Sequence, residues 1–137
     1  MKILIVEDEP VSREVLRKIL SSREDCQISI AQNGDEAWAL LDDPNRAFDV
    51  VFLDITMPEP DGLEVLRRIR QSPLLQSVYV VMCTATSDRA TVTKVIQLGA
   101  QSYVVKPCNE AGVLAKLTQA QSVSPARKIA RISVSSS

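Results

Sequence analysis

The chain has 137 residues, of which 45% are hydrophobic and 24% charged, with a formal net charge of -1. A chain of this length can bury one hydrophobic core, and its nearly neutral charge gives no basis for binding nucleic acid. No apolar run approaches the roughly 20 residues that span a bilayer, and no signal peptide is recognisable, so we expect one cytoplasmic domain without a membrane role.

Short apolar runs alternate with longer amphipathic stretches, and this alternation continues along most of the chain. Runs rich in Val and Ile predict β-strands at residues 2–6, 27–31, 49–53, 77–82 and 101–105. Apolar residues at the helical period predict α-helices at residues 10–21, 35–43, 63–71, 87–98 and 109–121. Pro10 suits a first helical position, and Gly99 suits the end of a helix.

The repeated strand–helix unit predicts an α/β fold with a five-stranded parallel sheet, doubly wound as (βα)5 with helices on both faces. Some of the strands are apolar almost throughout, which is typical of central strands buried on both faces. The composition changes after residue 121, where Pro125 ends any helix and serines accumulate. We therefore expect a domain at residues 1–121 and a flexible, basic, serine-rich tail or linker stub at residues 122–137.

The cysteines Cys26, Cys83 and Cys108 are odd in number and far apart in the sequence, and the chain contains no histidine. Zinc sites usually combine closely spaced cysteines with each other or with histidine. We therefore expect all three to be reduced thiols without a disulfide or metal role.

Acidic residues follow two of the predicted strands. Glu7, Asp8 and Glu9 come directly after the first strand, and Asp54 comes directly after the third. Ligands of doubly wound sheets bind at the carboxyl ends of the strands, so Glu7, Asp8 and Asp54 converge if these strands are neighbours. Clustered carboxylates raise one another's pKa unless a cation neutralises them. Oxygen ligands without histidine or thiolate favour a hard divalent ion, and Mg2+ fits best.

A hydroxyl and an ammonium group arrive at the same edge of the sheet. Thr84 comes at the end of the fourth strand, and Lys106 comes at the end of the fifth. Each alone has an ordinary explanation, because Thr84 could cap a strand and Lys106 could be a surface lysine. Together with the acids they supply the nucleophile, the metal site and the donors that phosphoryl transfer to a carboxylate requires.

The fragments ILIVEDEP, NGDEAW, LDITMPEPDG, CTA and YVVKP occur in this order along the chain. In this order and spacing they resemble the response regulator receiver domain of two-component signalling, over residues 1–121. The resemblance implies a flavodoxin-like strand order, 2-1-3-4-5. It also implies a signalling domain that catalyses only its own phosphorylation and slow dephosphorylation, and is otherwise not an enzyme.

The resemblance further implies roles for the acidic residues. Asp54 would be the phosphoacceptor, with Glu7 and Asp8 forming an acidic pocket beside it. Asp8 would bind Mg2+ directly, and Glu7 would bind it through water. Asp54 and the backbone carbonyl of Thr56 would complete the protein ligands.

By the same resemblance, Thr84 and Lys106 would contact the phosphoryl oxygens, and Tyr103 would change rotamer when Thr84 moves. Pro107 resembles the proline that follows a cis peptide bond in this family. The phosphoryl donor would be a sensor histidine kinase or a phosphotransfer protein. Phosphorylation would switch a face formed by the fourth helix, fifth strand and fifth helix, which binds a downstream effector protein or a fused output domain rather than nucleic acid.

Two other functions share parts of this pattern. A haloacid-dehalogenase-like phosphatase would carry a second acid two residues after its nucleophile, where this chain has Thr56. A flavodoxin-like nucleotide binder would need phosphate-binding donors in the first loop, whereas residues 7–9 would repel phosphate, and no GxGxxG motif occurs. Whether the domain acts alone or within a longer regulator stays open.

Overall fold

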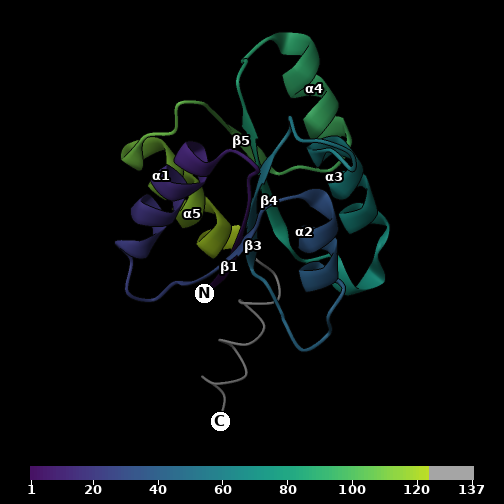
Figure 1. Cartoon of the computed structure of the whole chain (residues 1–137), viewed down its shortest axis with the longest axis horizontal. Coiled ribbons are helices and arrows are strands. Elements are labelled where there is room, and N and C mark those ends of the chain that lie inside the picture. The colour runs from purple at the N-terminus through teal and green to yellow at the C-terminus, as the bar shows by residue number, and fades with distance from the viewer. Residues whose placement is uncertain (124–137) are drawn as a thin grey trace.

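A five-stranded parallel sheet lies between two layers of helices (Figure 1). The computed structural model describes residues 1–123, and the strand order is β2-β1-β3-β4-β5. The strands are β1 (Lys2–Val6), β2 (Gln27–Ala31), β3 (Val50–Asp54), β4 (Tyr79–Thr84) and β5 (Ser102–Val105). The helices are α1 (Pro10–Ser21), α2 (Gly34–Leu41), α3 (Gly62–Gln71), the 3-10 turn η1 (Pro73–Leu75), α4 (Arg89–Gln97) and α5 (Glu110–Val123). The predicted fold class and strand order are therefore confirmed.

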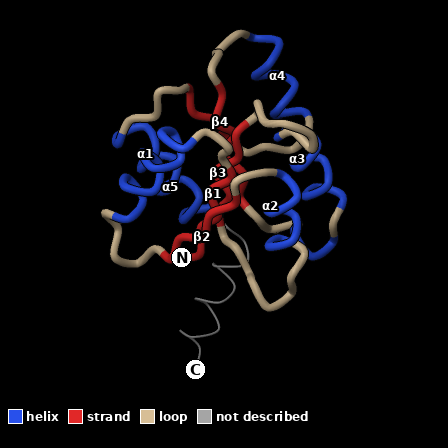
Figure 2. The backbone as a smooth tube through the Cα atoms, in the orientation of Figure 1, coloured by secondary structure: helices blue, strands red, loops and turns tan. Residues whose placement is uncertain are grey.

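Helices α1 and α5 cover one face of the sheet, and α2, α3 and α4 cover the other (Figure 2). A separate hydrophobic cluster fills the space between the sheet and the helices on each face. Alternate residues of β1 illustrate this, because Ile3 and Ile5 join α1 and α5, whereas Leu4 and Val6 join α2, α3 and α4. Strands β1, β3 and β4 are buried along nearly their whole length, as their apolar sequences predict. Burial on both faces holds the carboxyl ends of these strands in fixed positions.

Strands β3 and β4 both end later than the sequence pattern predicts. β3 ends at Asp54 instead of residue 53, and β4 spans Tyr79–Thr84 instead of residues 77–82. The ladder continues because Asp54 pairs with Cys83 and the amide of Ile55 donates to the Cys83 carbonyl at 3.1 Å. The apolar runs in the sequence end before Asp54 and Thr84, so they place the ends of both strands too early. Because the ladder continues, Asp54 and Thr84 are strand residues with fixed backbones.

The three acidic residues of the β1–α1 connection have different roles, because one of them caps the helix. Glu9 is the N-cap of α1, and its carboxylate accepts the amide hydrogens of Val11 at 3.0 Å and Ser12 at 2.7 Å. Pro10 takes the first helical position, as predicted. Because Glu9 is occupied by this cap, only Glu7 and Asp8 of the three acids are free to serve a site.

No helix within residues 1–123 has the length and apolar character needed to cross a membrane. The cytoplasmic location expected from the sequence is not tested by this observation and stays a prediction. The tail expected at residues 122–137 lies outside the described residues, apart from its first two, which continue α5.

Gly62 permits the first turn of α3 to pack directly on the end of β3. A Cβ atom at this position would lie 1.9 Å from the Asp54 carbonyl oxygen, whereas one at Gly112 in α5 would lie 3.2 Å from a side-chain oxygen of Asn109. We predict that Gly62→Ala lowers the free energy of unfolding by about 3 kcal/mol through overpacking against backbone. Gly112→Ala is the control, with a change below about 1 kcal/mol because alanine favours the helix. Urea denaturation measures both, and equal effects would contradict this packing.

Candidate functional site

Three carboxylates from two strand ends converge at one edge of the sheet. Val6 pairs with Leu53 in the β1–β3 ladder, so the next residues, Glu7 and Asp54, emerge side by side. Asp8 follows in the β1–α1 loop. One carboxylate oxygen from each of Glu7, Asp8 and Asp54 lies within 4.8 Å of the other two. The convergence expected from the sequence is therefore present.

Lys106 bridges two of these carboxylates from the end of β5. Its Nζ lies 2.6 Å from Glu7 Oε1 and 3.0 Å from Asp54 Oδ1. Glu7 is completely buried and Asp54 is only 3% exposed, while the side chain of Lys106 retains 21% exposure. The site is thus an acidic pair held beneath the surface by one ammonium group.

The environment shifts the pKa of both Glu7 and Lys106. Burial, followed by the neighbouring Asp54 carboxyl, raises the pKa of Glu7, and the contact with Lys106 only partly opposes this. Burial also acts to lower the pKa of Lys106, but its pairs with Glu7 and Asp54 outweigh burial and raise it. Lys106 therefore stays charged, whereas the ionised form of Glu7 is disfavoured by its burial more than the Lys106 ammonium stabilises it.

The donor set of the cluster fits a hard divalent cation. The Glu7–Lys106 contact is an ion pair, and the buried Glu7 Oε1 accepts no directed hydrogen bond. One ammonium cannot neutralise three carboxylates, and all three present oxygen, the ligand that Mg2+ prefers. Asp8 is exposed and gives the cluster an open side. Glu7, Asp8 and Asp54 are therefore the residues that could hold such an ion.

The loop after β3 turns back over Asp54. The amide of Thr56 donates to Asp54 Oδ1 at 3.3 Å, which places Thr56 beside the carboxylate. The role of the Thr56 backbone carbonyl as a metal ligand stays a prediction.

Thr84 lies at the same edge, but its hydroxyl is engaged within its own loop. Thr84 Oγ1 donates to the carbonyl oxygen of Thr86 at 2.9 Å and accepts the Thr86 amide at 3.1 Å. Tyr103 on β5 is partly buried against the cluster formed with α2, α3 and α4. The structure therefore brings Glu7, Asp54 and Lys106 into contact, while the Thr84 hydroxyl is hydrogen-bonded within its own loop.

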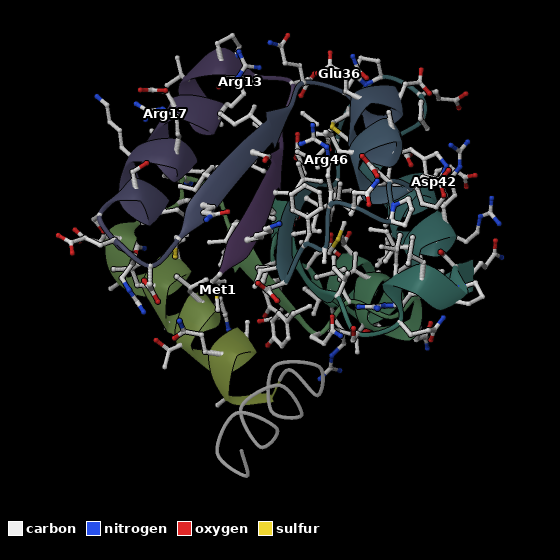
Figure 3. All side chains as sticks on the ribbon, turned by 90° about the horizontal axis from the view of Figure 1, so that it is seen from below. Met1, Arg13, Arg17, Glu36, Asp42 and Arg46 are labelled. Atoms are coloured by element: carbon white, nitrogen blue, oxygen red, sulfur yellow. The ribbon has the colours of Figure 1, made fainter. Side chains whose placement is uncertain are left out.

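Some contacts of the site were missed by sequence reasoning. Arg13 on α1, labelled in Figure 3, donates from Nη1 to the Glu7 carbonyl oxygen at 3.2 Å. The peptide bonds Lys106–Pro107 and Glu59–Pro60 are both cis, and only the first had a counterpart in the resemblance. Cys108 lies in the loop after Lys106 and interacts with Cys83 on β4. Nothing in the spacing of the cysteines along the chain signalled this contact.

Comparisons with known proteins agree with this geometry. The family model "Response regulator receiver domain" matches residues 3–118. The chain is 37% identical over 120 residues to the chemotaxis protein CheY of Listeria monocytogenes, covering 88% of this chain and 98% of that protein. It is 40% identical over 106 residues to the transcriptional regulatory protein ResD of Bacillus subtilis, covering 77% of this chain but only 42% of ResD.

Among solved structures, the Mn2+-bound form of response regulator Rcp1 is similar, with a TM-score of 0.72 at 26% identity. The match covers 89% of this chain and 92% of that structure. Both the backbone arrangement and the sequence thus place this chain with receiver domains.

The raised pKa of Glu7 predicts an unusual effect of neutralising this residue. A carboxyl whose folded pKa lies above its ordinary 4.5 destabilises the fold once it ionises, and this penalty disappears as the pH falls toward 4.5. Glu7→Gln should therefore increase the free energy of unfolding at neutral pH in metal-free buffer, with a smaller increase near pH 4.5.

Urea denaturation at the two pH values measures this difference. Glu14→Gln on the exposed face of α1 is the matched control, because its hydrogen bond with Arg17 lowers the pKa of Glu14. The control should not gain stability at neutral pH. A loss of stability in Glu7→Gln at neutral pH would show that the Lys106 ion pair dominates instead.

Proposed function

The chain belongs to the response regulator receiver domain family of two-component signalling, and on this premise we propose that Asp54 accepts a phosphoryl group from a phosphohistidine. The donor is a sensor histidine kinase or a phosphotransfer protein. The observation that carries the proposal is the buried Asp54 carboxylate with Lys106 Nζ at 3.0 Å. Family membership favours this function over the phosphatase and nucleotide-binding alternatives.

Asp54 is positioned to act as a nucleophile. Its Oδ1 is held by Lys106 and by the Thr56 amide at 3.3 Å, which leaves Oδ2 to form the bond to phosphorus. The phosphorus–nitrogen bond of the phosphohistidine breaks as this bond forms, and the leaving imidazole nitrogen keeps the electron pair and takes a proton. Because β3 is buried on both faces, the nucleophile keeps its orientation as the phosphoryl group arrives.

Lys106, together with the ion that the acidic cluster would hold, would offset the negative charge of the transferred phosphoryl group. Bound Mg2+, which Glu7, Asp8 and Asp54 would hold, supplies positive charge that offsets the phosphoryl oxygens. The similar structure of Rcp1 is of a Mn2+-bound form, which supports a divalent ion as a ligand of this fold. Lys106 remains protonated because its pKa is raised, and its Nζ can move from Glu7 and Asp54 to a phosphoryl oxygen.

Phosphorylation would then change the hydrogen bonds of Thr84. The hydroxyl gives up Thr86, which costs about 1 kcal/mol, and donates to a phosphoryl oxygen in a charge-assisted bond worth roughly 1.5–3 kcal/mol. Thr84 moves inward, and Tyr103 fills the space that it leaves. The population shifts toward an active arrangement of α4, β5 and α5, which binds a downstream effector or a fused output domain.

Phosphorylation of Asp54 is testable with a small-molecule donor. With acetyl phosphate and Mg2+, we predict that the wild type gains one phosphoryl group, measured by intact-protein mass spectrometry. Asp54→Asn should gain none, because the amide is not a nucleophile for this reaction. Asp42→Asn, an exposed change at the end of α2, should label like the wild type. Equal labelling of Asp54→Asn would rule out this assignment.

Metal binding gives a second test that does not depend on phosphorylation. At free Mg2+ about 100 times its dissociation constant, the free energy of unfolding should rise by about 2.7 kcal/mol, because the ion binds only the folded acid cluster. Asp8→Asn should lose most of this gain, since Asp8 is an exposed ligand whose replacement disturbs no packing. Asp42→Asn should keep the full gain. An Mg2+ effect of wild-type size in Asp8→Asn would remove Asp8 from the metal site.

A further inference from the structure

Two cysteines that are distant in the sequence, Cys83 and Cys108, come together near the proposed phosphorylation site. Cys83 is the second-last residue of β4, is 1% exposed, and faces the hydrophobic cluster formed with α1 and α5. Cys108 lies between β5 and α5 and packs against the same cluster. The amide of Lys106 donates to the Thr84 carbonyl at 2.7 Å, which draws this loop across the end of β4.

The two thiols influence each other directly. Their mutual interaction is the largest cause of the pKa shift at both thiols, and it raises the pKa of Cys83 and lowers that of Cys108. The Lys106 ammonium further favours the Cys108 thiolate. Because Cys108 is partly exposed and Cys83 is buried, Cys108 is the thiol that an oxidant reaches first, with Cys83 as its partner.

Only one member of the pair is accessible from outside. Cys108 lines an open hollow of about 350 Å³ between β5 and α5, together with Tyr103, Val105 and Lys116. Cys83 is covered by the cluster behind it. A small oxidant can therefore reach Cys108 first, and the product then lies next to the buried thiol.

We propose that hydrogen peroxide converts Cys83 and Cys108 into a disulfide. The Cys108 sulfur attacks one peroxide oxygen, the oxygen–oxygen bond breaks, and a sulfenic acid and one water result. The Cys83 sulfur then attacks the Cys108 sulfur, the sulfur–oxygen bond breaks, and a second water leaves with the thiol proton. Two thiols thus lose two electrons, which reduce one peroxide to water.

The third cysteine provides an internal control. Cys26 directly precedes β2 and so lies at the amino edge of the sheet, opposite to the pair. Burial and the neighbouring Asp25 carboxylate raise its thiol pKa, which disfavours the reactive thiolate. Cys26 should therefore remain a thiol at peroxide concentrations that link the pair.

The disulfide would also act on the proposed phosphorylation site, and this consequence rests on the proposed function. It would join the residue before Thr84 to the loop that carries Lys106, and so stabilise the arrangement in which Thr84 binds Thr86. A crosslink that favours this arrangement opposes the phosphorylated one. Oxidation should therefore reduce labelling of Asp54.

Peptide mapping tests the disulfide without any assay of function. Trypsin places Cys26, Cys83 and Cys108 in three different peptides. After peroxide treatment and alkylation of the remaining thiols, the wild type should yield the Cys83 peptide linked to the Cys108 peptide, with Cys26 alkylated. Cys26→Ser should give the same link. In Cys83→Ala, the link should be lost and dimedone should trap a sulfenic acid on Cys108.

The wild-type map decides the proposal even if Cys83→Ala folds poorly. A Cys108 sulfenic acid that accumulates in the wild type without the link, or a link to Cys26, would overturn it. Labelling with acetyl phosphate is then compared for the linked and the reduced wild type. Dithiothreitol should restore the labelling that the disulfide reduces. Equal labelling of the two forms would overturn the regulatory consequence. Labelling of neither would overturn the proposed function and leave the disulfide to the peptide map.

Discussion

The contact on which the site depends is the bridge from the Lys106 ammonium to Glu7 and Asp54. It holds two buried carboxylates close together, and burial raises the pKa of one of them, Glu7. A single positive charge is too little for this cluster, and that imbalance makes the site receptive to a divalent ion. The same imbalance limits stability, because ionised Glu7 opposes folding while no further cation is present.

The remainder of the fold keeps these groups in place. Central strands buried on both faces cannot rotate their last residues, so Asp54 and Thr84 project from fixed backbones. Lys106 lies one residue past the end of β5 and has more freedom, as its partial exposure shows. The proposed chemistry uses this division, since the nucleophile stays still while the lysine and the threonine hydroxyl exchange partners.

Much of this arrangement could be predicted from the sequence. Alternating periodicities indicate each strand and helix, and a parallel sheet then requires the polar residues after its strands to share one edge. Apolarity could not locate the true ends of β3 and β4, because the ladder at Asp54 and Cys83 is maintained by backbone pairing. The strand order came from resemblance to a family, since nothing in the periodicity orders parallel strands.

Contacts made by single side chains were harder to foresee. Glu9 resembles Glu7 and Asp8 in the sequence, and only the direction of the chain entering α1 makes it a cap. The meeting of Cys83 and Cys108 depends on how the loop after β5 crosses β4. The sequence predicts three reduced thiols, and all three are free thiols in the structure, but their spacing gave no sign that Cys83 and Cys108 influence each other.

The close packing at Gly62 has a mechanical consequence. Because no side chain separates α3 from the Asp54 carbonyl, the strand end and the first turn of this helix form one rigid unit. Any motion that followed the proposed phosphorylation would therefore be directed away from α3 and toward the loops after β4 and β5. The absence of one methyl group on the α3 side would thus help to determine on which side of the molecule the proposed signal emerges.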